Sequence, residues 1–205
     1  MYVIFIDADD YIAKDTLRKP HQKAVSSKAD IVFYDFVRFY GDNNTDSSFK
    51  TYINLDPSKT YTRNQLSRKI FNIFPILVCN KLIKINILKK NQIRFKSEYL
   101  REEDVDFSIR ATLHARRFAY LDYEGYFYRV ENLESETSTN YSHPTELLRI
   151  LIDLNKLIVT EQKALKRSFD NYAIEKYIVA LRDKKVIQMP TERHLILHQA
   201  LLSHS

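Results

Sequence analysis

Two kinds of hydrophobic pattern divide the chain into predicted strands and helices. Short runs of β-branched and aromatic residues predict strands at residues 2–6, 31–40, 51–55, 117–121 and 126–130. Cap residues and apolar spacing predict helices at residues 15–27, 62–74, 85–91 and 103–115. The polar segment 41–48 is typical of a loop or hairpin tip, and Pro75 ends the second helix.

Beyond Pro144 the pattern becomes helical. Leucine and isoleucine recur at three- and four-residue spacing up to Ile158, a second helical stretch covers residues 169–186, and residues 191–205 predict a short final helix. Basic residues line this region. They are typical of a solvated face over an apolar core, and the alternative is peripheral contact with an acidic membrane surface.

Composition excludes several classes of function. With Gly 2 in 205 residues, a glycine-rich phosphate loop is impossible, which weakens a dinucleotide-binding or P-loop interpretation. The formal net charge of +6 favours anionic partners, but no nucleic-acid-binding motif is present, so we expect no nucleic acid partner. Cys79 alone forms no intramolecular disulfide, no run spans a bilayer and no secretory signal follows Met1. These features predict a cytoplasmic protein.

The segment Asp7-Ala8-Asp9-Asp10 carries the first candidate chemistry. It directly follows the apolar run 2–6, so a buried strand is expected to deliver three carboxylates to its carboxyl end, where open α/β sheets bind ligands. Hard carboxylate oxygens suit Mg²⁺ or Mn²⁺, and such an ion could hold a diphosphate. The plainer alternative is an Asp-rich turn after a strand.

Two further groups of residues are candidates for chemistry. Acidic residues at 102, 103, 104 and 106 open a predicted helix, where the helix dipole favours them; alternatively, one is a general base toward a sugar hydroxyl. Arg129 ends an aromatic strand beside the hydroxyl-rich segment 134–139 and could grip phosphate or sugar. A surface arginine beside a loop is the simpler interpretation.

Taken in order, these pieces resemble the family-2 glycosyltransferases, the bacterial type that builds cell-surface polysaccharides. The resemblance covers residues 2–140. The segments that carry it are Asp7-Ala8-Asp9-Asp10, Asp30-Ile31-Val32, Cys79-Asn80-Lys81-Leu82, Arg94-Phe95, Glu103-Asp104-Val105-Asp106-Phe107, and Tyr126 to Arg129 with Ser135 and Thr137. The resemblance implies an α/β, GT-A-like fold, truncated here, with a mixed sheet and flanking helices. We expect a partial GT-A-like domain at residues 1–143 and a helical C-terminal extension at residues 144–205.

The resemblance also implies a reaction and its residues. A hexosyltransferase would move a sugar, with inversion and a Mn²⁺ or Mg²⁺ ion, from a nucleotide-sugar donor, expected to be a UDP-sugar, to a polysaccharide or lipid-linked acceptor. In the Asp-x-Asp (DXD) motif, Asp7 falls on the donor-binding position and Asp9 on the metal ligand. Asp10 supports them, and Arg129 faces the diphosphate. Asp104 is the expected base, and Glu103 is its rival.

Departures from the family pattern shape the other expectations. The usual N-terminal nucleotide-binding strands do not precede Met1, so we expect a partial catalytic domain that truncation could inactivate, and a strand at 2–6 prone to aggregation or homodimer pairing. A haloacid-dehalogenase-like phosphohydrolase, with Asp7 as nucleophile, is one alternative. A non-catalytic binding or oligomerisation module is another. The family's lipid-linked acceptors would place the protein at the inner face of the cell membrane.

Overall fold

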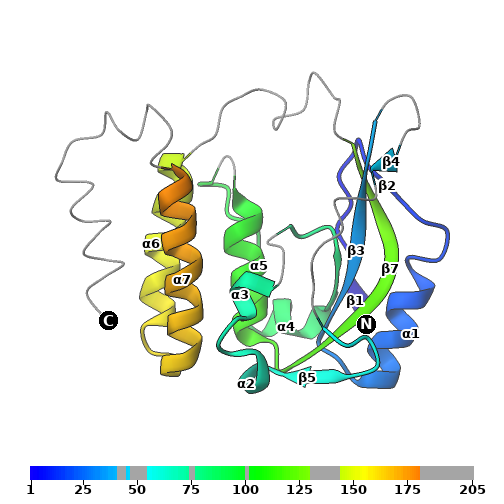
Figure 1. The fold of residues 1–205 in the computed structure, drawn as a ribbon, viewed down its shortest axis with the longest axis horizontal. Helices are drawn as coiled ribbons and strands as arrows, with labels where there is room; N and C mark the ends of the chain where they lie inside the picture. Colours follow the sequence, from blue (N-terminus) through cyan, green and yellow to red (C-terminus); the bar gives the residue numbers. More distant parts are fainter. Residues whose placement is uncertain (41–44, 47–54, 74–76, 100–101, 130–143, 181–205) are drawn as a thin grey trace.

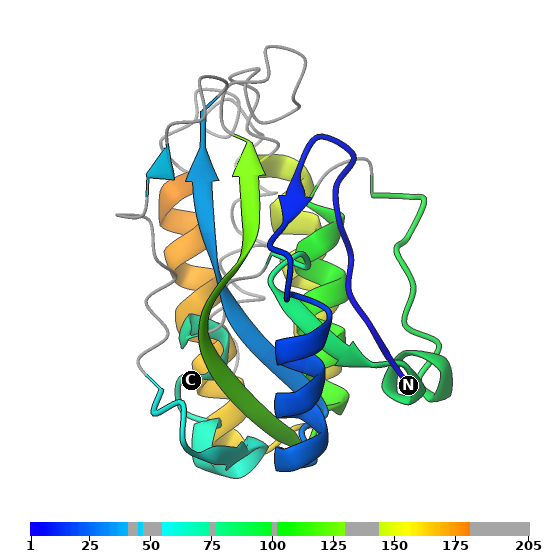
Figure 2. The same cartoon turned by 90° about the vertical axis from the view of Figure 1, so that its right-hand side faces the viewer.

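The chain folds around one mixed sheet with helices on both of its faces (Figures 1 and 2). The computed structural model describes residues 1–40, 45–46, 55–73, 77–99, 102–129 and 144–180. The strands are β1 (Tyr2–Val3), β2 (Tyr11–Ile12), β3 (Ile31–Phe39), β4 (Thr45–Asp46), β5 (Thr60–Thr62), β6 (Lys81–Lys84) and β7 (Arg117–Arg129). The helices are α1 (Arg18–Ser27), α2 (Arg63–Leu66), α3 (Ile70–Ile73), α4 (Ile85–Lys90), α5 (Glu103–His114), α6 (Pro144–Ile158) and α7 (Lys163–Ala180).

Strand β3 is the centre of the fold. The main path of the seven-stranded sheet runs β1-β6-β3-β7-β2, with β4 added to β3 and β5 added to β7. Strands β3 and β7 lie side by side in parallel, and β6 pairs antiparallel with β3 (Figure 2). Because successive side chains of a strand point to opposite faces, Ile31 and Phe33 join the larger apolar cluster, whereas Val32 and Tyr34 join the smaller one. The mixed α/β architecture predicted from the sequence is confirmed.

The first strand departs from its prediction. A buried strand was expected at residues 2–6, but β1 ends at Val3, is half-buried, and pairs antiparallel with β6 at an edge of the sheet. The second aromatic residue of this run, Phe5, explains the early end. Phe5 packs edge-on against Phe95 and Phe107, with ring centroids 5.3 and 5.1 Å away, and so turns toward α5 rather than along the ladder.

Strand β7 is one long strand where two short ones were predicted. Parallel pairing with β3 continues through irregularities at Tyr34–Asp35 and Asp35–Phe36, which carry the ladder across the polar residues 122–124. Gly125 allows the close approach at this point, because a Cβ there would lie 2.7 Å from the ring of Tyr34. The predicted break was therefore wrong, since sheet pairing outweighs the local polar signal.

The predicted helix at 62–74 is also divided, into α2 and α3. Thr62 caps α2 as predicted: its hydroxyl accepts the backbone N–H of Gln65, whose side chain accepts the N–H of Thr62. At the other end the Ser67 hydroxyl donates to the carbonyl of Asn64 at 2.8 Å, which satisfies one carbonyl at the helix end.

The two C-terminal helices pack on the rest of the molecule. Figure 1 shows α5 between the sheet and the α6–α7 pair, and Leu151, Leu154 and Phe169 belong to the same apolar cluster as Ile31. Helix α7 begins at Lys163, six residues before the prediction. The division at residue 143 stays a prediction. The predicted features at 41–44, 47–54, Pro75, 134–139 and 181–205 lie outside the described residues.

Within the described part of the chain, no helix has the length and apolar character needed to cross a membrane.

Candidate active site

The acidic segment after β1 forms a reverse turn tied to β7. The backbone N–H of Asp10 donates to the carbonyl of Asp7 at 3.2 Å, which closes the turn. Tyr126 joins its two ends: the hydroxyl accepts the N–H of Asp7 at 3.1 Å and donates to Asp10 Oδ2 at 2.6 Å. Asp10 Oδ1 accepts the backbone N–H of Arg129 at 2.8 Å. Both oxygens of Asp10 thus anchor the turn to the sheet.

Arg129 lies against this turn. Its Nε donates to the backbone carbonyl of Asp9 at 2.9 Å, and its guanidinium carbon lies 4.7 Å from the centre of the Phe39 ring. Tyr11, next to the turn, stacks on Phe127 at 4.5 Å between ring centroids. The structure therefore brings Asp9, Asp10 and Arg129 together, although β7 and the turn are about 120 residues apart in sequence.

Burial and like charges act together on the carboxylates of the turn. Burial raises the pKa of Asp7, and the charges of Asp9 and Glu103 raise it further. Burial also raises the pKa of Asp10, although hydrogen bonds from Arg129 and Tyr126 work in the opposite direction. The influence of Glu103 on Asp7 means that the turn and the start of α5 share one electrostatic environment.

The start of α5 supplies the second group of acids. Glu102 precedes the helix with a left-handed φ of 59°, a conformation that non-glycine residues seldom adopt. Two residues further on, Asp104 Oδ2 accepts the backbone N–H of Val78 at 3.2 Å. Burial raises the pKa of Asp104 to about 6, against the lowering effects of Val78 and of the Lys81 ammonium. Asp104 is thus a carboxylate with a pKa near neutrality.

A pocket joins these two groups. Its volume is about 530 Å³, and it is lined by Phe5, Ile6, Asp7, Val78, Phe95, Lys96, Ser97, Tyr99, Glu103 and Asp104. Asp7 and both candidate bases therefore face a common cavity. Asp9, Asp10 and Arg129 are not among its lining residues: the two aspartates belong to the adjoining turn, and Arg129 at the end of β7 contacts that turn. This arrangement separates the predicted site into an acid-lined pocket and an adjoining turn.

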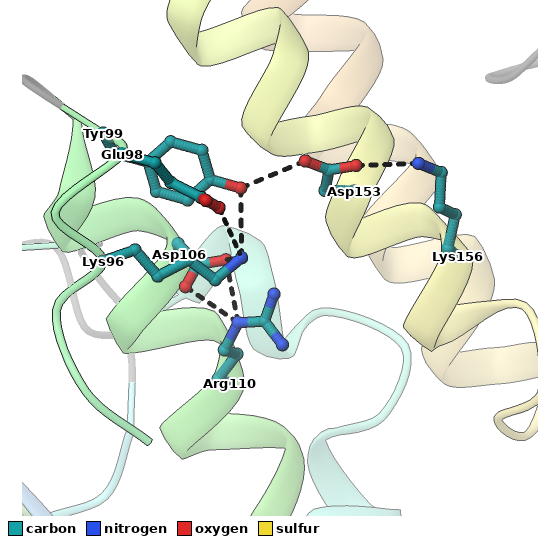
Figure 3. A network of polar contacts seen from close by, with 7 residues as sticks. All are labelled: Lys96, Glu98, Tyr99, Asp106, Arg110, Asp153 and Lys156. Atoms are coloured by element: carbon teal, nitrogen blue, oxygen red, sulfur yellow. Dashed lines mark hydrogen bonds and ion pairs between the residues drawn. The ribbon is translucent and has the colours of Figure 1, made fainter. Parts of the chain in front are cut away.

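A polar network holds the outer wall of the pocket (Figure 3). The Lys96 ammonium donates to the Tyr99 hydroxyl at 3.2 Å and lies 3.6 Å from the buried carboxylate of Asp106 on α5. Arg110, one turn along α5, donates its Nε to both oxygens of Asp106 at 2.8 Å. The Tyr99 hydroxyl in turn donates to Asp153 on α6 at 3.1 Å. The segment 96–99 is thereby fixed to two helices.

The acids beside the pocket bear on metal binding. Among the described residues, no group of three or more His, Cys, Asp or Glu side chains is arranged to hold a metal ion. Mg²⁺ sites that include substrate phosphates need only one or two protein carboxylates. Asp9 offers such an oxygen donor next to Asp7, whose pKa its charge already raises. A divalent ion held at Asp9 together with a diphosphate stays a prediction.

Comparison with known proteins identifies the N-terminal segment. Residues 1–91 match the family model described as glycosyl transferase family 2. These residues belong to that family. The matched segment includes Asp7, Asp9, Asp10 and Lys81, whereas Glu103, Asp104 and Arg129 follow it in the chain.

Related glycosyltransferases extend beyond this segment. The poly(ribitol-phosphate) beta-N-acetylglucosaminyltransferase TarS of Staphylococcus aureus (strain MW2) is 27% identical over 150 residues, 73% of this chain and 24% of TarS. A poly(ribitol-phosphate) beta-glucosyltransferase of Bacillus spizizenii is 26% identical over 154 residues, 75% of this chain and 23% of that protein. The chain thus spans about a quarter of the length of these curated relatives.

Solved structures support the fold. The crystal structure of S. aureus TarS 1–349 in complex with UDP-GlcNAc superposes with a TM-score of 0.64 at 19% identity, over 98% of this chain and 57% of that one. The crystal structure of TarS 1–349 in complex with UDP gives a TM-score of 0.61 at 20% identity, over 97% of this chain and 54% of that one. The GT-A-like α/β fold predicted from the sequence is confirmed.

Sequence reasoning missed two residues that shape the site. Tyr126 was noted only as part of an aromatic strand, yet it joins Asp7 to Asp10. Lys81 was noted only within a family segment, yet it is 1% exposed and lowers the pKa of Asp104. A lysine among apolar residues was the available signal for the second. Ser135 and Thr137 lie outside the described residues.

Proposed function

We propose that this chain forms part of a glycosyltransferase that moves a sugar from a UDP-sugar to a glycan or lipid-linked acceptor with inversion. One observation carries the proposal most directly. Asp7 and the Glu103–Asp104 pair line one pocket, and the turn that bears Asp9 and Asp10 adjoins it, with Arg129 of β7 bound to that turn. The names of the relatives suggest UDP-N-acetylglucosamine and UDP-glucose as the donors to test, and poly(ribitol phosphate) as the first acceptor.

Asp104 is the proposed general base. A base must be ionised at the working pH and still have appreciable affinity for a proton, and a carboxylate with a pKa of about 6 meets both conditions near pH 7. The acceptor hydroxyl gives its proton to Asp104 as its oxygen attacks the anomeric carbon and the diphosphate leaves. Transfer in one displacement inverts that carbon. Glu103, in the same pocket, is the rival base.

The turn beside the pocket is the proposed diphosphate end of the site. Asp9 would hold a Mn²⁺ or Mg²⁺ ion together with the diphosphate oxygens. When bound, such an ion neutralises charge on the leaving group. Asp7 binds the donor next to it. The Arg129 guanidinium, placed by the Phe39 ring and the Asp9 carbonyl, faces the diphosphate.

Calorimetric titration with UDP, with and without Mn²⁺, tests this function. The chain is expected to bind UDP more tightly with Mn²⁺, and Asp9→Asn is expected to remove the metal effect. Asp15→Asn is a matched control, because it also neutralises an aspartate near the N-terminus, but one that pairs with Arg18 at 3.1 Å and is not part of the Asp7–Asp10 turn. Absence of UDP binding by the chain would contradict the proposal. Release of phosphate from a phosphomonoester would point to the phosphohydrolase instead.

A further inference from the structure

Lys81, at the start of β6, is a lysine buried in the protein interior. Its side chain is 1% exposed, and its ammonium lies 5.7 Å from the centre of the Phe33 ring. Burying a charge is costly unless hydrogen bonds and an opposite charge compensate it. The Lys81 ammonium donates to the Leu77 carbonyl, and at 3.3 Å to Asn80 Oδ1. Both of these acceptors are neutral, so neither of them compensates the charge.

The segment 77–81 also contacts Asp104, through Val78. Val78, which follows Leu77, donates its backbone N–H to Asp104 Oδ2 at 3.2 Å. Asp104 and Lys81 also act on each other electrostatically: the ammonium lowers the pKa of Asp104, and the carboxylate raises that of Lys81. Residues 77–81 therefore provide both a hydrogen-bond donor, the Val78 N–H, and a positive charge, the Lys81 ammonium, that act on the Asp104 carboxylate.

We propose that Lys81 is a positioning residue: by its hydrogen bond to the Leu77 carbonyl it holds residues 77–81 against the start of α5, and it places a buried positive charge near the Asp104 carboxylate. The inference deepens the proposed function, because it rests on Asp104 being the base. Lys81 does not line the pocket, so it acts on the reaction only through Asp104.

Two acidic neighbours act on Asp104 in the opposite direction to Lys81. Glu103 and Asp7 face Asp104 and raise its pKa, as burial does. Cys79 faces Lys81, but burial raises the pKa of its thiol to about 12, so the thiol is neutral at pH 7. Burial lowers the pKa of Lys81 to about 8, which leaves the ammonium charged at pH 7. A buried positive charge thus opposes two acidic neighbours.

Carbon-13 NMR titration of the Asp104 carboxyl tests the proposal without any need for sugar transfer. Three variants of the chain are compared with the wild type. Lys81→Met removes the charge and the hydrogen bonds, whereas Lys81→Gln removes the charge and keeps an amide donor. Lys166→Met is the control, because Lys166 is a buried lysine on α7 that pairs with Asp170 at 2.6 Å.

Both Lys81 variants are expected to raise the pKa of Asp104 from about 6 to above about 7, and the control is expected to leave it unchanged. The proposal is overturned if neither variant moves this pKa, or if Lys81→Met alone does, since the hydrogen bonds would then suffice. A pKa that rises in a chain without transferase activity would support the Lys81 coupling and count against the proposed function.

A reciprocal measurement covers the case in which the Lys81 variants do not fold. Two coupled groups influence each other's titration, so Asp104→Asn must lower the pKa of Lys81 below its value of about 8. Nitrogen-15 NMR of the lysine ammonium measures this change. An unchanged Lys81 pKa in Asp104→Asn would overturn the proposal.

Discussion

The Asp7–Asp10 turn and the start of α5 are both rich in carboxylates, but the hydrogen bonds made to these carboxylates differ between the two regions. In the turn, both oxygens of Asp10 accept hydrogen bonds from β7, one from the Tyr126 hydroxyl and one from the Arg129 backbone. At the start of α5, Asp104 accepts a backbone hydrogen bond from Val78, is more deeply buried, and has a pKa of about 6.

This difference separates an anchoring carboxylate from a reactive one. Hydrogen bonds from the sheet fix Asp10 and oppose the effect of burial on its pKa. Asp104 keeps a high proton affinity and faces the pocket. Carboxylates that look alike in the sequence can thus differ in role, and their hydrogen-bond partners show which one holds the backbone and which one can accept a proton.

The largest effect is expected from removing the proton acceptor of α5. Asp104→Asn should lower kcat by about 10²- to 10⁴-fold, because the amide cannot act as a base. The fold should persist, since the amide oxygen can still accept the Val78 N–H. UDP release from the UDP-sugar in the presence of poly(ribitol phosphate) measures the rate.

Glu103→Gln is the matched control for that substitution. It alters the neighbouring acid in the same pocket and should cost much less activity than Asp104→Asn. If Glu103→Gln abolishes transfer while Asp104→Asn retains it, the roles of the two carboxylates must be exchanged.

The next effect concerns stability at the outer wall of the pocket. Asp106→Asn leaves Arg110 and Lys96 without their buried counter-charge, and should lower the free energy of unfolding by about 2–4 kcal/mol. Urea unfolding measures the loss. Lys156→Ala breaks an exposed ion pair with Asp153 in the same network and should cost only about 0–1 kcal/mol (Figure 3). Equal losses would show that Asp106 is not the centre of this network.

A smaller effect is expected at the turn. Tyr126→Phe removes the hydroxyl that joins Asp7 to Asp10, and should lower the free energy of unfolding by about 1–3 kcal/mol and weaken UDP binding. Tyr61→Phe is the control, because its hydroxyl makes one exposed contact, with the N–H of Asp56 at 2.9 Å. Unchanged UDP affinity in Tyr126→Phe would mean that the turn does not depend on this tether.

Local signals predicted the elements whose pattern agrees with their tertiary surroundings. The continuous apolar run of β3 became the central strand, and the cap at Thr62 formed as expected. Two predictions failed where distant contacts decide: Phe5 turns away from the sheet toward α5, and pairing with β3 carries β7 across polar residues. The helix expected at 62–74 is also divided, after Leu66.

The residue types of the site could be predicted from the sequence, and so, in part, could which of these residues lie close together. The resemblance pointed to Asp7, Asp104 and Arg129, and the structure places the first two on one pocket and the third on β7 against the adjoining turn. Their hydrogen-bond partners could not be predicted, because Tyr126 and Lys81 act across separations that no local pattern encodes. The pKa of Asp104 depends on those partners and on burial.

The acid limb of the pH dependence of kcat/KM tests the central claim most directly. A base must be ionised in the free enzyme, so sugar transfer should fall about tenfold per pH unit below a midpoint near pH 6, where Asp104 becomes protonated. Above that midpoint the rate should level off. A rate that stays constant from about pH 7 down to pH 5, or an unchanged midpoint in the residual activity of Asp104→Asn, would contradict the assignment of Asp104 as the base.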